Sequence, residues 1–215
     1  IRLPSIIPVD WRQPGIISTF YRANLTGANL TNANLRDANL ENANLTNANL
    51  TEAMLHRVNL TGANLTNADL TGTNIQYANL TGADLTDTIL TGFDLSGMDL
   101  TGTILRGVDL SDMDLTYTIL ARADLSNTIL AGADLSNVVF FQTILTGSDL
   151  TDTILTGADF TGVDLSGAKL IGLDLSGMDL TGMMLTGADL TDTVLTGADL
   201  TGANLTNANL RDANL

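Results

Sequence analysis

Ala23-Asn24-Leu25-Thr26-Gly27 is the stretch that decides the fold, because variants of this pentapeptide follow one another without a break from Tyr21 to Leu215. The 39 copies contain no insertion, and the central position is Leu, Ile or Phe in every copy. A period this short predicts a solenoid, in which one unit buries little by itself and stacked units share a continuous core.

Each repeat carries the pattern of a very short strand followed by a corner. The two residues before the central Leu are a small residue, usually Ala, and then Asn or Asp. The order small, polar, Leu alternates inward and outward, which is the periodicity of a strand. The next two residues are mostly Thr or Ser and then Gly, Asn or Asp, which favour turns. A helix is disfavoured, because a five-residue period drifts around its 3.6-residue turn and frequent Gly and Asn destabilise it.

The recurrence of one repeat variant indicates how many repeats make a coil. Stacked coils would pair their backbones about 4.8 Å apart, with Leu over Leu inside. The variant Thr88-Ile89-Leu90 recurs 40 residues later as Thr128-Ile129-Leu130, and Thr103-Ile104-Leu105 recurs as Thr143-Ile144-Leu145. Forty residues are two whole coils of four repeats, so this spacing favours four repeats per coil over three.

With the motif A(D/N)Lxx, the chain resembles the pentapeptide-repeat family over residues 21–215, in the Asn- and Asp-rich style of its cyanobacterial members. The resemblance implies an all-β fold, a right-handed quadrilateral parallel β-helix. Thirty-nine repeats would then make about 9.75 coils and a rod about 47 Å long at the sheet spacing. Gyrase-protecting members often carry a C-terminal dimerisation helix, and nothing in this sequence matches it.

Residues 1–20 fit the repeat poorly and are expected to form an N-terminal cap segment ahead of the 21–215 β-helix. Three prolines interrupt them, and Trp11 is the only tryptophan of the chain. We expect Trp11 and Phe20 to cover the open end of the leucine column, as solenoids require. A binding role for Trp11 is the alternative.

The two ends of the sequence leave several interpretations open. No capping sequence follows the last repeat, and residues 201–215 are identical to residues 26–40. Duplication of a low-complexity segment, a fragment cut from a longer array, end-to-end self-association and membership of a larger assembly all fit this pattern. The chain starts at Ile1 rather than Met, so we expect a processed N-terminus or a fragment. A cytoplasmic location, the periplasm and the thylakoid lumen stay open.

Composition excludes several classes of protein. There are no cysteines, and no apolar run approaches the eighteen residues of a membrane span. The formal net charge of −15 lies within residues 81–200, where eighteen aspartates face three basic residues. Such acidity favours solubility and disfavours direct binding to nucleic acid or an anionic membrane.

The sequence contains no constellation of catalytic residues, so we expect no enzyme, no cofactor and no metal site. His56 is the only histidine and occupies a corner of a repeat, where an exposed surface role is expected. The Thr-Gly pairs are corners followed by strand rather than by helix, so they do not form a phosphate-binding loop.

Outward-facing aspartates form the one candidate interaction surface. On two of the four predicted faces they alternate with uncharged residues or Lys169, which relieves a repulsion of about 1 kcal/mol between stacked charges. On the other two faces they stack, and these positions form the candidate acidic partner surface: Asp94, Asp114, Asp134, Asp159, Asp179 and Asp199. Six coils, together about 29 Å long, would carry a charge of −15, close to the roughly 17 negative charges of a DNA duplex of that length.

Two functions follow from these observations. The first is a non-enzymatic structural or protein-interaction scaffold, a rigid acidic solenoid that binds a protein partner. The alternative is a DNA-mimic regulator that binds a DNA-processing enzyme such as gyrase. A solvated acidic surface that only keeps molecules apart, and weak binding of divalent cations by stacked aspartates, are further interpretations. The sequence names neither the partner, the biological process nor the oligomeric state.

Overall fold

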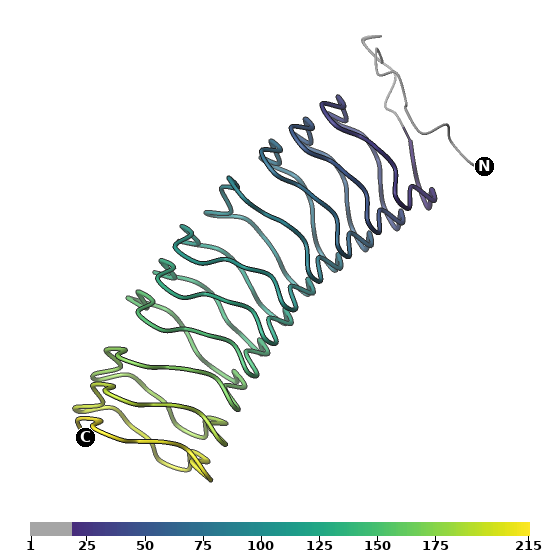
Figure 1. Cartoon of the computed structure of the whole chain (residues 1–215). Helices are drawn as coiled ribbons and strands as arrows, with labels where there is room; N and C mark the ends of the chain where they lie inside the picture. The colour runs from purple at the N-terminus through teal and green to yellow at the C-terminus, as the bar shows by residue number, and fades with distance from the viewer. Residues whose placement is uncertain (1–18) are drawn as a thin grey trace. The chain divides into compact units, whose positions relative to one another are not determined.

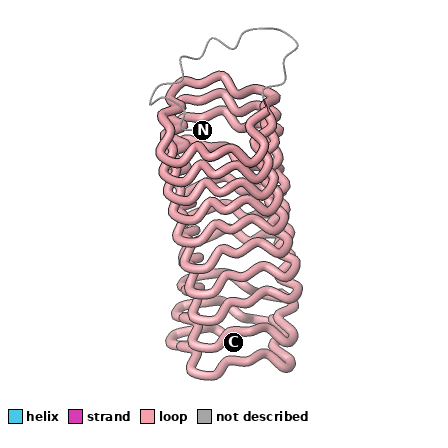
Figure 2. The backbone as a smooth tube through the Cα atoms, turned by 90° about the vertical axis from the view of Figure 1, so that its right-hand side faces the viewer, coloured by secondary structure: helices cyan, strands magenta, loops and turns pink. Residues whose placement is uncertain are grey.

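The computed structural model describes residues 19–215, and within them the chain winds in successive coils (Figure 1). This part of the chain contains no helix and no strand longer than one residue, so its backbone is drawn entirely as loop (Figure 2). Every repeat except that of Asp94 instead contributes a single bridge residue, almost always the Asn, Asp or apolar residue before the central Leu, and each repeat has a two-residue turn. The short strands predicted from the sequence are thus reduced to single-residue bridges.

All bridges are parallel, and each joins a residue to the one 20 positions later. Asn24 pairs with Asn44, which pairs in turn with Asn64. Twenty residues are four pentapeptides, so one coil takes four repeats, as predicted from the recurrence of the Thr-Ile-Leu variant. The side chains of residues 20 apart therefore stack on the same face.

Residues 43–47 show how one repeat satisfies all five of its backbone N–H groups. The amide of Ala43 bonds to the carbonyl of Leu40 at 2.9 Å and closes the preceding turn. The amides of Asn44, Leu45 and Asn47 bond to carbonyls of neighbouring coils at 2.9, 2.7 and 2.9 Å. The fifth amide, that of Thr46, bonds to the side-chain Oδ1 of Asn44 at 3.0 Å. Asn or Asp is therefore favoured at this position, because its side chain accepts a hydrogen bond from the one backbone amide that has no partner in the ladder.

The second turn residue adopts a left-handed backbone, which explains the frequent Gly, Asn and Asp there. Asn32 has φ of 57° and Gly27 has φ of 65°. Two bulky residues occupy the same conformation, Tyr77 at 59° and Tyr117 at 60°. This conformation is unusual for a large side chain.

The core is a column of central leucines flanked by small residues. Leu125 and Leu130 are completely buried, and Phe140 stacks on Phe160 with ring centroids 5.1 Å apart. Where Thr replaces the inward Ala, its hydroxyl bonds to a backbone carbonyl, as Thr103 Oγ1 does to Leu100 O at 2.7 Å. Within residues 19–215 no buried polar side-chain atom lacks a hydrogen-bond partner.

The chain divides into two compact units. The first ends at Asp94 and also contains Asp99–Val108, and the second comprises Leu95–Met98 and Asp109–Leu215. At the start of the described chain, Thr19 already forms a bridge to Asn39, and the amide of Phe20 bonds to Asn39 O at 2.7 Å. Phe20 therefore occupies a central repeat position. Trp11, the other residue of the predicted cap, lies outside the described residues.

Candidate interaction surface

The outer surface is built on the Asn or Asp before each central residue. The Oδ1 atom of Asp159 accepts hydrogen bonds from the Thr161 amide at 2.9 Å and the Thr161 hydroxyl at 2.6 Å. The hydroxyl and then the backbone amide of Thr161 hold the pKa of Asp159 below its usual value. Bonds of the same type lower the pKa at several further positions: Asp69, Asp109, Asp114, Asp174, Asp179 and Asp199. These carboxylates are therefore ionised at neutral pH and held in one orientation.

The structure brings together some of the predicted acidic surface and separates the rest. Asp114 bridges to Asp134, and Asp179 bridges to Asp199, so each pair occupies one face on consecutive coils. Asp159 bridges to Val139 on the coil before it, and no bridge between Asp159 and Asp179 is found within residues 19–215. Asp94 belongs to the first compact unit, whereas the other five belong to the second.

A cleft interrupts the ladder between Asp159 and Asp179. Its volume is about 690 Å³, and it is lined on one side by residues 153–161 and on the other by Asp174, Ser176, Met178 and Asp179. The wider spacing of the coils is visible in the green part of the chain in Figure 1.

Large residues in the inward small position explain this cleft. Three successive repeats place Leu173, Met178 and Met183 where most repeats have Ala. In residues 19–215 the next amides, those of residues 174, 179 and 184, form no backbone bond to the preceding coil, although every amide at this position from 134 to 169 forms one. Leu173 and Met183 are buried.

The coils part between residues 174 and 181 and are joined again at Met184, which bridges to Asp164 and whose carbonyl accepts the amide of Leu165 at 2.9 Å. Separation beside the large inward residues is expected when a well-packed core is overfilled.

His56 has no catalytic surroundings. It is half-buried rather than exposed as predicted, because its ring makes an edge contact with Tyr77, with centroids 5.3 Å apart. The described chain contains no group of three or more His, Asp or Glu side chains that could hold a metal ion. None of the described residues forms a helix long and apolar enough to cross a membrane.

The repeat geometry agrees with comparisons to known proteins. The family model "Pentapeptide repeats (8 copies)" matches six overlapping or adjoining ranges: residues 23–62, 53–92, 94–132, 118–157, 158–197 and 184–215. The chain belongs to the pentapeptide-repeat family. No curated protein matches it.

Solved structures of other pentapeptide-repeat proteins are similar to this one. HetL, a protein involved in regulation of heterocyst differentiation in the cyanobacterium Nostoc sp. strain PCC 7120, is 32% identical. The match covers 92% of this chain and 89% of HetL, with a TM-score of 0.54. QnrB1, a plasmid-mediated fluoroquinolone resistance protein, is 22% identical over 87% of this chain and 86% of its own, with a TM-score of 0.37.

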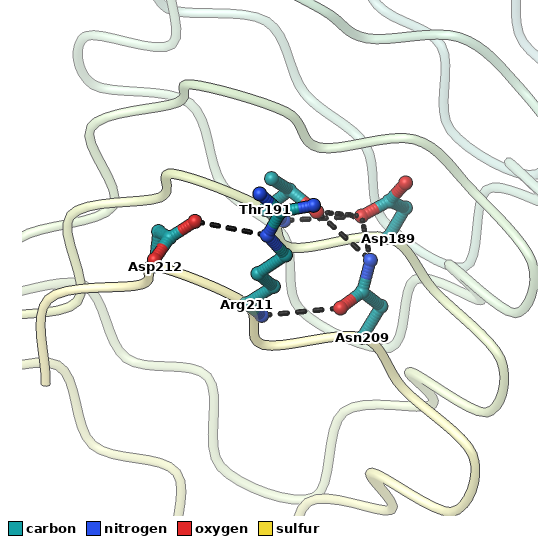
Figure 3. A network of polar contacts seen from close by, with 5 residues as sticks. All are labelled: Asp189, Thr191, Asn209, Arg211 and Asp212. Atoms are coloured by element: carbon teal, nitrogen blue, oxygen red, sulfur yellow. Dashed lines mark hydrogen bonds and ion pairs between the residues drawn. The ribbon is translucent and has the colours of Figure 1, made fainter.

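In this pentapeptide-repeat protein, two aspartates of one alternating face, Asp149 and Asp189, are paired with donors from the next coil. Lys169 forms an ion pair with Asp149 at 2.9 Å. Near the C-terminus, the amide Nδ2 of Asn209 donates to Asp189 Oδ1 at 3.0 Å and to Thr191 Oγ1 at 2.9 Å (Figure 3). The alternation on this face therefore pairs charges within the fold and leaves fewer carboxylates for a partner.

The cleft was not predicted from the sequence, although Leu173 and Met178 in place of Ala are a visible signal. The first compact unit shows the same association on a smaller scale. There Phe93 occupies the small position, and a cleft of about 190 Å³ lies beside it, lined by Thr73, Asn74, Ile75, Gln76, Gly92 and Asp94. Both clefts therefore lie beside a large residue at this position.

Proposed function

We propose that this chain is a non-enzymatic scaffold that presents a rigid acidic surface to a protein partner. The observation that carries the proposal is the outward carboxylate held in a fixed turn on coil after coil, as at Asp159 and Asp199. The second compact unit holds fifteen acidic residues against three basic ones. Such a surface attracts a basic partner and steers its approach.

Rigidity supports the same proposal. Because every amide of a regular repeat is bonded, as in residues 43–47, the side chains are fixed before a partner arrives and lose little freedom on binding.

We include in this proposal a right-handed quadrilateral β-helix of about 9.75 coils at four repeats per coil. A regulatory interaction role is consistent with the similarity to HetL, which is involved in regulation of heterocyst differentiation.

Affinity purification of the tagged full-length chain from its native cells tests the scaffold. We expect one protein to co-purify in stoichiometric amount at low salt. It should be released when the ionic strength is raised to the physiological value, which shortens the Debye length from about 30 Å to about 8 Å. The matched variant Asp159→Asn/Asp179→Asn/Asp199→Asn keeps an oxygen for each turn bond and should recover less of that protein. Absence of any stoichiometric protein at low salt would refute the scaffold, and a discrete self-assembled species would assign the partner role to a second copy.

The stacked carboxylates favour a second candidate, a DNA-mimic regulator of a DNA-processing enzyme such as gyrase. Asp114 over Asp134 and Asp179 over Asp199 keep like charges on successive coils despite their repulsion. Addition of the chain to a gyrase supercoiling assay tests this candidate. Mimicry would be supported if the chain inhibited supercoiling, if excess duplex DNA relieved the inhibition and if the triple Asn variant did not inhibit. Unchanged supercoiling would refute the DNA-mimic function.

A further inference from the structure

Five apolar residues in the second compact unit replace residues that are polar or small in most repeats. Ile119, Val139 and Ile144 occupy the position of the outward Asn or Asp, Phe141 replaces the first turn residue, usually Thr or Ser, and Tyr117 replaces the usual Gly, Asn or Asp. All five are between 39% and 67% exposed. We call this set the apolar patch.

Backbone contacts place the five residues of the apolar patch on two adjacent coils. Ile119 forms a parallel bridge with Val139, so their side chains are stacked on one face. Phe141 and Ile144 follow Val139 around the next corner, and Phe141 O accepts the amide of Arg122 at 2.8 Å. Tyr117 lies on the corner just before Ile119 and bonds through its amide to Ser136 O at 3.1 Å.

The apolar patch is unusual in this protein because apolar residues stack there without an intervening acid. On the neighbouring face Ile144 lies between Asp124 and Asp164, which is the alternating pattern. Tyr117 also adopts φ of 60°, a conformation that Gly or Asn would adopt with less strain. The fold requires none of these five side chains, and a contiguous exposed apolar set surrounded by polar residues is typical of an interaction site.

Carboxylates border the apolar patch. Asp159 bridges to Val139 and Asp164 bridges to Ile144, both on the coil that follows. Asp114 and Asp134 lie one repeat before Ile119 and Val139, on the adjoining face. Asp159 is also the point where the patch meets the 690 Å³ cleft, whose far side adds Asp174 and Asp179. Arg122 is the basic residue nearby, and its Nε donates to Gln142 Oε1 at 3.3 Å.

We propose that the apolar patch, with its acidic border, docks a partner protein segment that has an apolar centre flanked by Lys or Arg. This inference rests on the proposed scaffold function and names the surface and the chemistry of its partner. An interface with an aromatic and aliphatic centre and a charged rim is the usual anatomy of protein recognition. A second copy docked patch to patch would bring two acidic borders together, so charge complementarity favours a basic partner.

Synthetic peptides test the surface without knowledge of the natural partner. The probe is a 14-residue peptide of Leu and Lys with Leu at helical spacing, and its control carries Glu in place of Lys. Binding to the full chain is measured by calorimetry at low and high salt, and the contact surface is mapped by NMR. We expect the Lys peptide to bind and to shift the amides of residues 117–144, and the Glu peptide not to bind.

A variant that returns the apolar patch to the repeat consensus separates docking from folding: Tyr117→Asn, Ile119→Asn, Val139→Asn, Phe141→Thr and Ile144→Asn. Because each new residue is common at its position in other repeats, the coil should form as before, which protected amides will verify. We expect at least a tenfold rise in Kd. The matched control, Ile129→Asn with Met184→Asn, removes two other exposed apolar residues and should change Kd less than twofold.

The remaining arms distinguish the outcomes. Asp134→Asn/Asp159→Asn/Asp164→Asn should weaken binding at low salt and flatten its salt dependence. The proposal would be overturned if the patch variant and the control variant lost equal affinity for the Lys peptide. It would also be overturned if only the substitutions in the acidic border lowered that affinity. Self-association abolished by the patch variant would assign the surface to a second copy. If no natural partner is purified and the peptide still binds through the patch, the scaffold function fails while the docking surface stands.

Discussion

Substitution of Ala133 by Leu tests whether the size of the inward small residue sets the spacing of the coils. Ala133 is completely buried in a regular part of the second unit. The next residue, Asp134, donates its amide to Met113 O at 2.9 Å and accepts the amide of Leu115 at 2.9 Å. If Leu acts here as it does at Leu173, the coil will move away from the preceding one and both bonds will break.

The size of the effect follows from these contacts. Overfilling a packed core costs about 1–3 kcal/mol, and two lost backbone bonds cost about 0.5–1.5 kcal/mol each. We therefore expect Ala133→Leu to lower the free energy of unfolding by about 2–6 kcal/mol. Ala131→Leu, the same change at the first turn position two residues earlier, should change it by less than about 0.5 kcal/mol.

Urea unfolding measures the free energy, and hydrogen exchange of the amides of residues 115 and 134 reports the spacing directly. We expect faster exchange at both amides in Ala133→Leu and native protection in Ala131→Leu. Equal stability of the two variants, with both amides still protected, would refute the explanation of the cleft by core volume.

Three further predictions concern the core and the charges. Leu130→Ala, at a completely buried central position, should lower the free energy of unfolding by about 2–5 kcal/mol in urea, and a loss below 1 kcal/mol would mean that Leu130 does not face the core. Asp114→Asn should raise the melting temperature at low salt, because it removes a repulsion from Asp134 of about 1 kcal/mol. This gain in melting temperature should shrink in high salt. Asp164→Asn is the control, because Asp164 lies between uncharged bridge partners. The pKa values of Asp69, Asp109 and Asp159 are lowered by the hydroxyl and amide of the residue two positions on. The unfolded chain therefore binds these protons first, so stability should be constant above about pH 4 and fall as the pH drops through the folded pKa values. An unchanged urea midpoint between pH 7 and pH 3 would contradict this assignment.

The features that repeat along the chain were predictable from the sequence. The five-residue period and the inward Leu follow from local pattern, since most repeats make the same contacts as their neighbours, and the four-repeat coil follows from the recurrence of the Thr-Ile-Leu variant 40 residues apart. The turn role of Thr26 and Gly27 follows in the same way from their chemistry.

The features that depend on the sum of core volumes were not predictable. Val58 replaces Ala and the next amide, that of Asn59, still bonds to Ala38 O at 3.0 Å, whereas the amide of Asp174 after Leu173 forms no backbone bond to the preceding coil. The five-residue period alone does not say how large the inward residue can be before neighbouring coils separate. For the same reason the acidic residues Asp159 and Asp179, which the period places in one stack, lie on opposite sides of a cleft.

The apolar patch was missed for a different reason. Ile144 fits the alternation of acids with uncharged residues, and in the sequence it is interpreted as a spacer between charges, whereas Ile119 and Val139 are not singled out. Only the bridge between Ile119 and Val139, with Phe141 and Tyr117 on the adjoining corners, shows that apolar side chains gather there.

Measurement of NMR scalar couplings across hydrogen bonds tests the four-repeat coil most directly. We predict couplings from the amide of Leu125 to the carbonyl of Ile144 and from the amide of Ile144 to the carbonyl of Ala123, at 2.8 and 3.0 Å. Couplings to carbonyls four residues earlier would indicate helix, and couplings to partners about 15 residues away would indicate three repeats per coil. Either result would contradict the stacking on which the acidic surface and the apolar patch depend.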